Sequence, residues 1–169
     1  MTTVAANREC MAADSFLHNG NSVLKIVEGD GILIGLIGDI FYAHMLARWV
    51  LTGARGMAPV WEEIWRYDKD DNACDTVLLI LRRDGLFLLD GRGQPVPMGD
   101  FAADGTGCDQ ALGILRAGGT PTDAVLRACE TDPATKPPVI TRSLVNARAP
   151  KRPYWPDLGE WPGQPRKRK

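Results

Sequence analysis

The sequence predicts an α+β protein in which two antiparallel sheets pack face to face and helices cover both outer faces, a four-layer α-β-β-α sandwich. The chain order is the first reason, because short apolar segments typical of strands alternate with segments of helical periodicity. Tight turns between consecutive strand candidates are the second, since such connections join antiparallel strands. The third is composition: 169 residues that are 44% hydrophobic suit one domain with a core.

The first part of the chain predicts four strands and then a helix. Residues 7–9 are expected to form a tight turn after the first strand, and residues 28–31 are typical of a second turn. Asp39 is expected to cap a helix that begins at Ile40, and Gly53 is expected to end it. The four expected strands are residues 3–6, 10–13, 22–27 and 32–37, the last fully apolar and therefore buried.

The second part of the chain predicts further strands and helices. Residues 82–85, Arg-Arg-Asp-Gly, are a strong hairpin signal. Thr120 is followed by Pro121 and, three residues after the cap, by Asp123, which is the pattern of a capped helix start. The expected strands are residues 76–81, 86–89, 101–103 and 138–143, and the expected helices are residues 60–67, 110–116 and 121–129.

Charge divides the chain into a domain, residues 1–145, and a tail, residues 146–169. The tail has seven Lys/Arg and two Asp/Glu, whereas the rest of the chain has 13 basic and 19 acidic side chains. The tail is also rich in Pro and Trp, a composition that cannot build a core. We expect it to be flexible or ordered by a partner, with docking on an acidic surface of its own or a neighbouring subunit as one outcome.

Several classes of protein are not expected. The cysteines Cys10, Cys74, Cys108 and Cys129 are widely spaced and form no CxxC pair, so we expect reduced thiols and no metal site. The start of the chain lacks the pattern of a secretion signal, and the apolar run 32–37 is too short to span a bilayer. We therefore expect a cytoplasmic protein, with no membrane partner and no nucleic-acid partner.

The start of the chain carries the clearest chemical possibility. Met1 precedes Thr2, a small residue that methionine aminopeptidase normally exposes. Thr2 would then combine a hydroxyl with a free α-amine, whose ordinary pKa of about 7.7–8.0 lets it accept the hydroxyl proton near neutral pH. A nearby ammonium would lower the pKa of this amine further. Because many proteins begin Met-Thr, the pair alone favours an ordinary start.

The surrounding motifs resemble proteasome β-subunits and, more closely, bacterial HslV-type peptidases and their small relatives in bacteria and phages. Gly105-Thr106-Gly107 resembles the family's Gly-Ser-Gly loop, and Asp132 and Thr135 keep its Asp-x-x-Ser spacing. The resemblance covers residues 2 to about 145 and implies the N-terminal nucleophile (Ntn) hydrolase fold. The other matching motifs are, in order, residues 2–6 (TTVAA), 11–15 (MAADS), 25–26 (KI) and 35–38 (GLIG).

The resemblance implies catalytic roles for the first four site residues. Thr2 would be the nucleophile and its amine the base. Lys25 would supply the cation that tunes the amine, and Asp14 would orient Lys25. The backbone N–H near Gly38 would form an oxyanion hole, which stabilises the charge of the transition state. Two other interpretations stay open: Asp14 and Lys25 as a surface ion pair, and Gly38 as a simple strand-to-helix turn.

Three further residues, Thr106, Asp132 and Thr135, would support the amine through hydrogen bonds. Asp132 precedes Pro133, so it is also compatible with a plain helix-ending turn. Threonine stands where the family has serine at 106 and 135, which keeps the hydroxyl. Residues 136–137, Lys-Pro, replace glycines of the family and leave the loop geometry open.

The resemblance implies a threonine peptidase that hydrolyses peptide bonds through an acyl-Thr2 intermediate and needs no cofactor. It also implies a homo-oligomeric ring with peptide or unfolded-protein substrates and an ATP-dependent unfoldase as a possible partner. Two alternatives stay open. One is an amidase acting on a small molecule, and the other is a catalytically silent structural or virion component that keeps only the fold.

Overall fold

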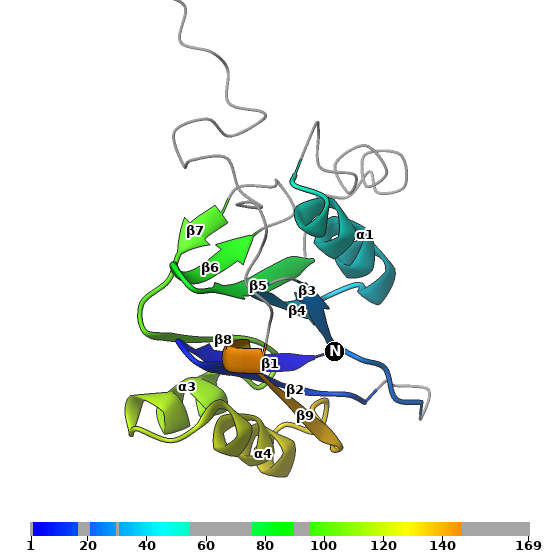
Figure 1. Ribbon diagram of the computed structural model, residues 1–169. Helices are drawn as coiled ribbons and strands as arrows, with labels where there is room; N and C mark the ends of the chain where they lie inside the picture. The colour runs from blue at the N-terminus through cyan, green and yellow to red at the C-terminus, as the bar shows by residue number, and fades with distance from the viewer. Residues whose placement is uncertain (1, 17–20, 30, 55–75, 90–94, 147–169) are drawn as a thin grey trace, which may run out of the picture.

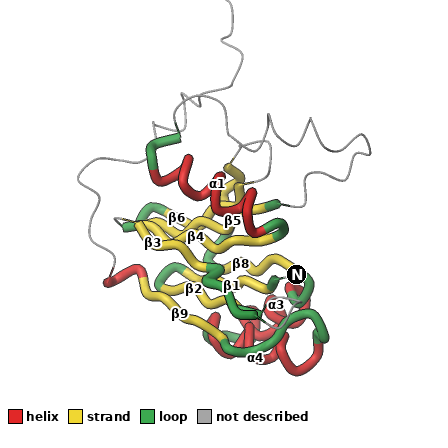
Figure 2. The backbone as a smooth tube through the Cα atoms, turned by 90° about the vertical axis from the view of Figure 1, so that its right-hand side faces the viewer, coloured by secondary structure: helices red, strands yellow, loops and turns green. Residues whose placement is uncertain are grey.

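A computed structural model describes residues 2–16, 21–29, 31–54, 76–89 and 95–146. Within these residues two antiparallel sheets lie face to face (Figure 1). Helix α1 covers the outer face of one sheet, and α3 and α4 cover the outer face of the other (Figure 2). The predicted four-layer α-β-β-α sandwich is therefore confirmed.

The first sheet carries the start of the chain in its middle. The turn after β1 closes because the Asn7 side chain accepts hydrogen bonds from the N–H groups of Glu9 and Cys10, each at 2.9 Å. The predicted hairpin is thus confirmed, and later strands pair on either side of it. The sheet order is β8-β1-β2-β9, formed by β1 (Thr3–Asn7), β2 (Cys10–Asp14), β8 (Phe101–Gly105) and β9 (Val139–Ser143).

The second sheet has the order β3-β4-β5-β6-β7. Its middle is as predicted, since all six residues of β4 are buried and the turn at 83–84 joins β5 to β6. The strands are β3 (Ile26–Gly29), β4 (Ile32–Ile37), β5 (Val77–Arg82), β6 (Gly85–Leu89) and β7 (Pro95–Pro97).

Two strand assignments from the sequence were wrong at the edges of this sheet. The third strand was expected from Ser22, but ladder pairing with β4 begins at Ile26, and Ser22 forms only an isolated bridge with Phe16. Strand β7, in which prolines flank Val96, was not among the expected strands. Its edge position explains the prolines, since an edge strand does not need every N–H for pairing.

Helices α1 and α4 begin where the sequence predicts. Asp39 caps α1 (Ile40–Leu51) by accepting hydrogen bonds from the N–H groups of Phe41 and Tyr42, at 2.9 and 3.1 Å. Thr120 and Asp123 form the capping box of α4 (Pro121–Thr131). Helix α3 (Cys108–Arg116) begins two residues before the predicted range, and η1 (Leu144–Asn146) follows β9. The predicted helix 60–67 and the tail from residue 147 lie outside the described residues.

Close packing between the layers depends on small residues. A Cβ on Gly35 of β4 would lie 2.5 Å from Val4 Cγ1 and 3.0 Å from Met11 Sδ on the opposite sheet, so glycine lets the two sheets approach. Between the first sheet and its helices the buried contacts include four alanines: Ala5, Ala12, Ala111 and Ala124. This short separation brings β1 close to the loops that precede α3 and follow α4.

Candidate active site

Thr2 and Thr3 lie at the start of β1, and alternation along the strand sets their surroundings. Val4 packs between the sheets, whereas Ala5 faces α3 and α4, so Thr3 shares the helix-facing side with Ala5. Thr2 is buried, with a relative exposure of 5%. Its carbonyl accepts a hydrogen bond from the Thr106 N–H at 3.0 Å, which fixes the Thr2 backbone at the end of β8.

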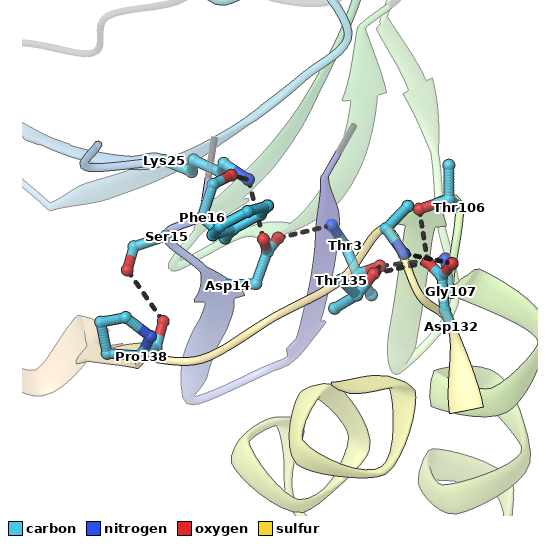
Figure 3. Close-up of polar contacts among 11 residues, drawn as sticks. Thr3, Asp14, Ser15, Phe16, Lys25, Thr106, Gly107, Asp132, Thr135 and Pro138 are labelled. Atoms are coloured by element: carbon cyan, nitrogen blue, oxygen red, sulfur yellow. Dashed lines mark hydrogen bonds and ion pairs between the residues drawn. The ribbon is translucent and has the colours of Figure 1, made fainter. Parts of the chain in front are cut away.

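Lys25 and Asp14 form a buried ion pair beside this start. The Lys25 Nζ donates to Asp14 Oδ2 at 2.8 Å and to the Phe16 carbonyl at 2.7 Å, and both charged side chains are almost fully buried. The other carboxylate oxygen, Oδ1, accepts the Thr3 N–H at 2.8 Å. One carboxylate thus holds both the ammonium and the backbone next to Thr2, so a surface ion pair is excluded (Figure 3).

Asp132 gathers two hydroxyls on the other side of β1. The hydroxyls of Thr106 and Thr135 donate to its Oδ2 at 2.5 and 2.6 Å, and the Ala134 N–H donates to Oδ1 at 3.0 Å. Burial acts to raise the pKa of Asp132, but these hydrogen bonds outweigh it and lower the pKa below its ordinary value. Asp132 also ends α4 as its C-cap residue, so the turn interpretation and the cluster both hold.

The loop after Thr135 has lysine and proline at 136–137, and the hydrogen bonds of the Asp132 cluster form with these residues in place. The Thr135 N–H donates to the Asp132 carbonyl at 3.1 Å, which forms a tight turn. Farther along, the N–H and the hydroxyl of Ser15 both donate to the Pro138 carbonyl, at 3.0 and 2.9 Å. The loop is therefore fixed to β2 at one end and to Asp132 at the other.

Thr3 connects the two groups of residues, a role that was not predicted from the sequence. Its hydroxyl lies 2.5 Å from the Thr135 hydroxyl and accepts the Gly107 N–H at 2.9 Å, while its own N–H bonds to Asp14 (Figure 3). The period of two in β1 was the available signal, because it places this polar side chain on a buried, helix-facing position that requires a partner.

Gly38 lies at the end of β4, immediately before the cap of α1. Its φ of +89° is a conformation that L side chains rarely adopt, which explains glycine at this position. Two residues earlier, the Leu36 N–H donates to the Lys25 carbonyl at 2.8 Å, so Gly38 lies on the Lys25 side of the site. Its role as an oxyanion donor stays a prediction.

In the described part of the chain, no three His, Cys, Asp or Glu side chains are arranged to hold a metal ion. Cys129 lies in α4, and burial, followed by the charges of Asp14 and Asp132, raises its pKa to about 11. This thiol is protonated at neutral pH and is therefore a poor nucleophile. None of the described helices is long and apolar enough to cross a membrane.

Comparison with known proteins gives matches among solved structures. No family model and no curated protein matches the chain. Thiobacillus denitrificans BPH superposes with a TM-score of 0.63 at 20% identity, covering 83% of this chain and 96% of BPH. BPH in complex with epoxomicin gives 0.62 at 19% identity, covering 85% of this chain and 97% of BPH. Eukaryotic HslV from Trypanosoma brucei gives 0.61 at 17% identity, covering 85% of this chain and 98% of HslV. The chain therefore has the proteasome-type Ntn hydrolase fold of BPH and HslV.

Proposed function

We propose that this protein is a threonine peptidase that cleaves peptide bonds through an acyl-Thr2 intermediate once Met1 has been removed. The observation that carries the proposal is the buried Lys25–Asp14 pair, which is bonded to the backbone directly after Thr2. A buried ion pair adds little net stability compared with apolar side chains, because desolvation opposes the attraction. A chemical role beside Thr2 accounts for its presence better than stability does.

The proposed reaction uses one residue as nucleophile and base. The Thr2 hydroxyl oxygen attacks the carbonyl carbon while its proton passes to the Thr2 amine. The Gly38 N–H, close to the N-terminus of α1, stabilises the oxyanion. The C–N bond then breaks, and the leaving amine takes the proton from the Thr2 ammonium. Water attacks the resulting ester with the amine again as base, which releases the acid and restores Thr2.

The two groups of residues flanking Thr2 supply opposite electrostatic effects. Lys25 favours the neutral amine needed to accept the hydroxyl proton. The carboxylate of Asp132, whose pKa lies below its ordinary value, is ionised at neutral pH and stabilises the ammonium that forms during attack. Thr106 and Thr135 hold that carboxylate in place through their hydroxyls. The pair and the cluster together give an amine that both accepts and returns a proton.

The fold shared with BPH and HslV supports a wider proposal about assembly. We propose a cytoplasmic, homo-oligomeric ring that encloses the active sites and degrades peptides or unfolded proteins, with an ATP-dependent unfoldase as partner. Epoxomicin is bound in one of the BPH structures. We propose that epoxomicin also reacts with Thr2 of this protein, which makes it the probe for the site.

The test combines intact mass with labelling and turnover. Purified protein should lack Met1, gain the mass of one epoxomicin per chain and cleave fluorogenic peptides. Thr2→Ala should lose both labelling and cleavage while staying folded, because only one hydroxyl and one methyl group are removed. The matched control is Thr131→Ala, an exposed hydroxyl on α4 that bonds only to its own helix, and it should behave as wild type.

The possible failures separate the alternatives. Cleavage by Thr2→Ala at the wild-type rate would remove the nucleophile assignment. Retention of Met1 with no labelling would support a catalytically silent component. Hydrolysis of small amides with no cleavage of any peptide in a broad panel would support an amidase.

A further inference from the structure

The Thr3 hydroxyl joins β1 to the Asp132 cluster through Thr135. Thr3 and Thr135 are both fully buried, so neither hydroxyl can exchange its partner for water. The Gly107 N–H donates to Thr3 Oγ1 at 2.9 Å, and the two hydroxyl oxygens lie 2.5 Å apart. A Cβ on Gly107 would lie 2.7 Å from Thr3 Oγ1, so the approach requires glycine.

Counting protons fixes the direction of this chain of hydrogen bonds. Each hydroxyl has one proton to donate. The Thr135 proton goes to Asp132, whose ionised carboxylate can only accept. Thr135 must then accept the proton of Thr3, and Thr3 in turn accepts the Gly107 N–H. The order is Gly107 N–H to Thr3 to Thr135 to Asp132, with every donor pointing towards the carboxylate.

We propose that Thr3 is a positioning residue for the reaction: its hydroxyl orients Thr135 and Asp132 against β1 so that the cluster faces the amine of the neighbouring Thr2. The inference rests on the proposed function, because the amine matters only if Thr2 is the nucleophile. Thr3 is suited to the task because its N–H bonds to Asp14 and its hydroxyl bonds to Thr135. It therefore ties both flanking groups to the residue after the nucleophile.

The first test measures epoxomicin labelling in three variants. Thr3→Val keeps the side-chain shape but removes the hydroxyl, Thr3→Ser keeps the hydroxyl, and Thr122→Val is the matched control. Thr122 also forms a threonine–threonine hydroxyl pair, with Thr141 at 2.7 Å, but at the start of α4, the opposite end of the helix from Asp132. Labelling rates are taken over a range of epoxomicin concentrations, which separates the maximal rate from the half-saturating concentration.

Thr3→Val should lower the maximal labelling rate about tenfold, the effect of one lost hydrogen bond, and leave the half-saturating concentration unchanged. Thr3→Ser should recover most of the rate, and Thr122→Val should equal wild type. Unfolding midpoints are measured in parallel. Wild-type labelling by Thr3→Val would overturn the proposal, as would an equal loss in Thr3→Ser.

The second test measures the chain of hydrogen bonds from Gly107 to Asp132 without any reaction. NMR of the Asp132 carboxyl carbon should show a higher pKa in Thr3→Val than in wild type, because Thr135 loses the donor that polarises its own hydroxyl. The Gly107 amide should exchange faster, since its acceptor is gone. Thr3→Ser should restore both the pKa of Asp132 and the exchange rate of the Gly107 amide. If neither changes in Thr3→Val, the proposed chain of hydrogen bonds is wrong.

The two measurements keep the failures apart. If wild type is never labelled at Thr2, the proposed function fails, and the positioning role fails with it even if the NMR values move. If wild type is labelled and Thr3→Val matches it, the proposed function stands and only the role of Thr3 is overturned.

Discussion

At the scale of single residues, burial makes each charge of the Lys25–Asp14 pair depend on the other for its stabilisation. Both side chains are out of water, and the carboxylate uses both oxygens, one for Lys25 and one for the Thr3 N–H. Removing either charge leaves the other without compensation in a medium of low dielectric constant. The pair therefore responds differently to single and double substitution, which separates its effect on stability from its effect on chemistry.

Lys25→Met should inactivate the enzyme and lower the free energy of unfolding by about 3–5 kcal/mol, because Asp14 is left as a buried, unpaired charge. The double variant Lys25→Met/Asp14→Asn should recover much of that stability but no activity, since the cation that favours the neutral amine stays absent. Urea unfolding and peptide cleavage measure the two effects. Full activity in the single variant at neutral pH would contradict the site proposed here.

Asp132 is expected to make the free energy of unfolding depend on pH. Its pKa in the folded protein is below the ordinary 3.8, so its hydrogen bonds stabilise the fold above that value and are lost as the pH falls through the lower, folded pKa. As the pH falls below about 4, the free energy of unfolding should fall more steeply for wild type than for Asp132→Asn. Denaturant unfolding at several pH values checks this, and equal slopes in the two proteins would contradict it.

At the scale of elements, β4 determines how closely the two sheets can pack. Its residues are buried on both faces, with Ile34 and Leu36 towards α1 and Leu33 and Ile37 towards the other sheet. Gly35 lies on this second face, where Val4 of β1 fills the space a side chain would need. The position of β1, and with it Thr2, thus depends on a glycine in the opposite sheet.

Gly35→Ala should lower the free energy of unfolding by about 1–3 kcal/mol, because the added methyl group forces Val4 and Met11 to move. The matched control is Gly113→Ala in α3, where a Cβ meets nothing within 4 Å. That substitution should raise stability by about 0.5–1 kcal/mol, since alanine favours a helix over glycine. Urea denaturation compares the two, and equal effects of the same sign would contradict this account of the packing.

At the scale of the whole molecule, three clusters of buried apolar side chains lie between the four layers of helices and sheets. One lies between α1 and β4–β5, one between the two sheets, and one between the first sheet and α3 and α4. The site lies where the first sheet meets the loops around α3 and α4, so its residues come from distant parts of the chain. The proposed ring would enclose this end of the sandwich.

Light scattering at micromolar concentration should give the mass of a large assembly rather than the 18.5 kDa of one chain. A variant truncated after Asn146 tests the basic tail, which lies outside the described residues. If the tail joins subunits, this variant should dissociate into smaller species, more readily at high salt because its seven Lys/Arg act by charge. A monomer for the full chain would contradict the ring, and an unchanged assembly after truncation would remove the role of the tail.

The sequence by itself determined the elements whose signals are local. The apolar run at 32–37, the turn at 82–85 and the caps at Asp39 and Thr120 appear in the structure as predicted, because each depends on neighbours within a few residues. At Ser22 the local sequence did not show where the strand begins, and the predicted start of β3 was misplaced by several residues. The start of β3 is decided by its pairing with β4, which begins only at Ile26.

Only the tertiary structure decided which candidate side chains meet. The spacing of Lys25 and Asp14 is equally compatible with an exposed pair, and burial by the packed sheets distinguishes the two. Thr3 and Thr135 are 132 positions apart, yet their hydroxyls touch because β1 lies beside the loop after α4. Hydrogen bonds require contact within about 3 Å. Contacts of that kind between remote residues follow from the packing of whole layers, and a local pattern does not contain them.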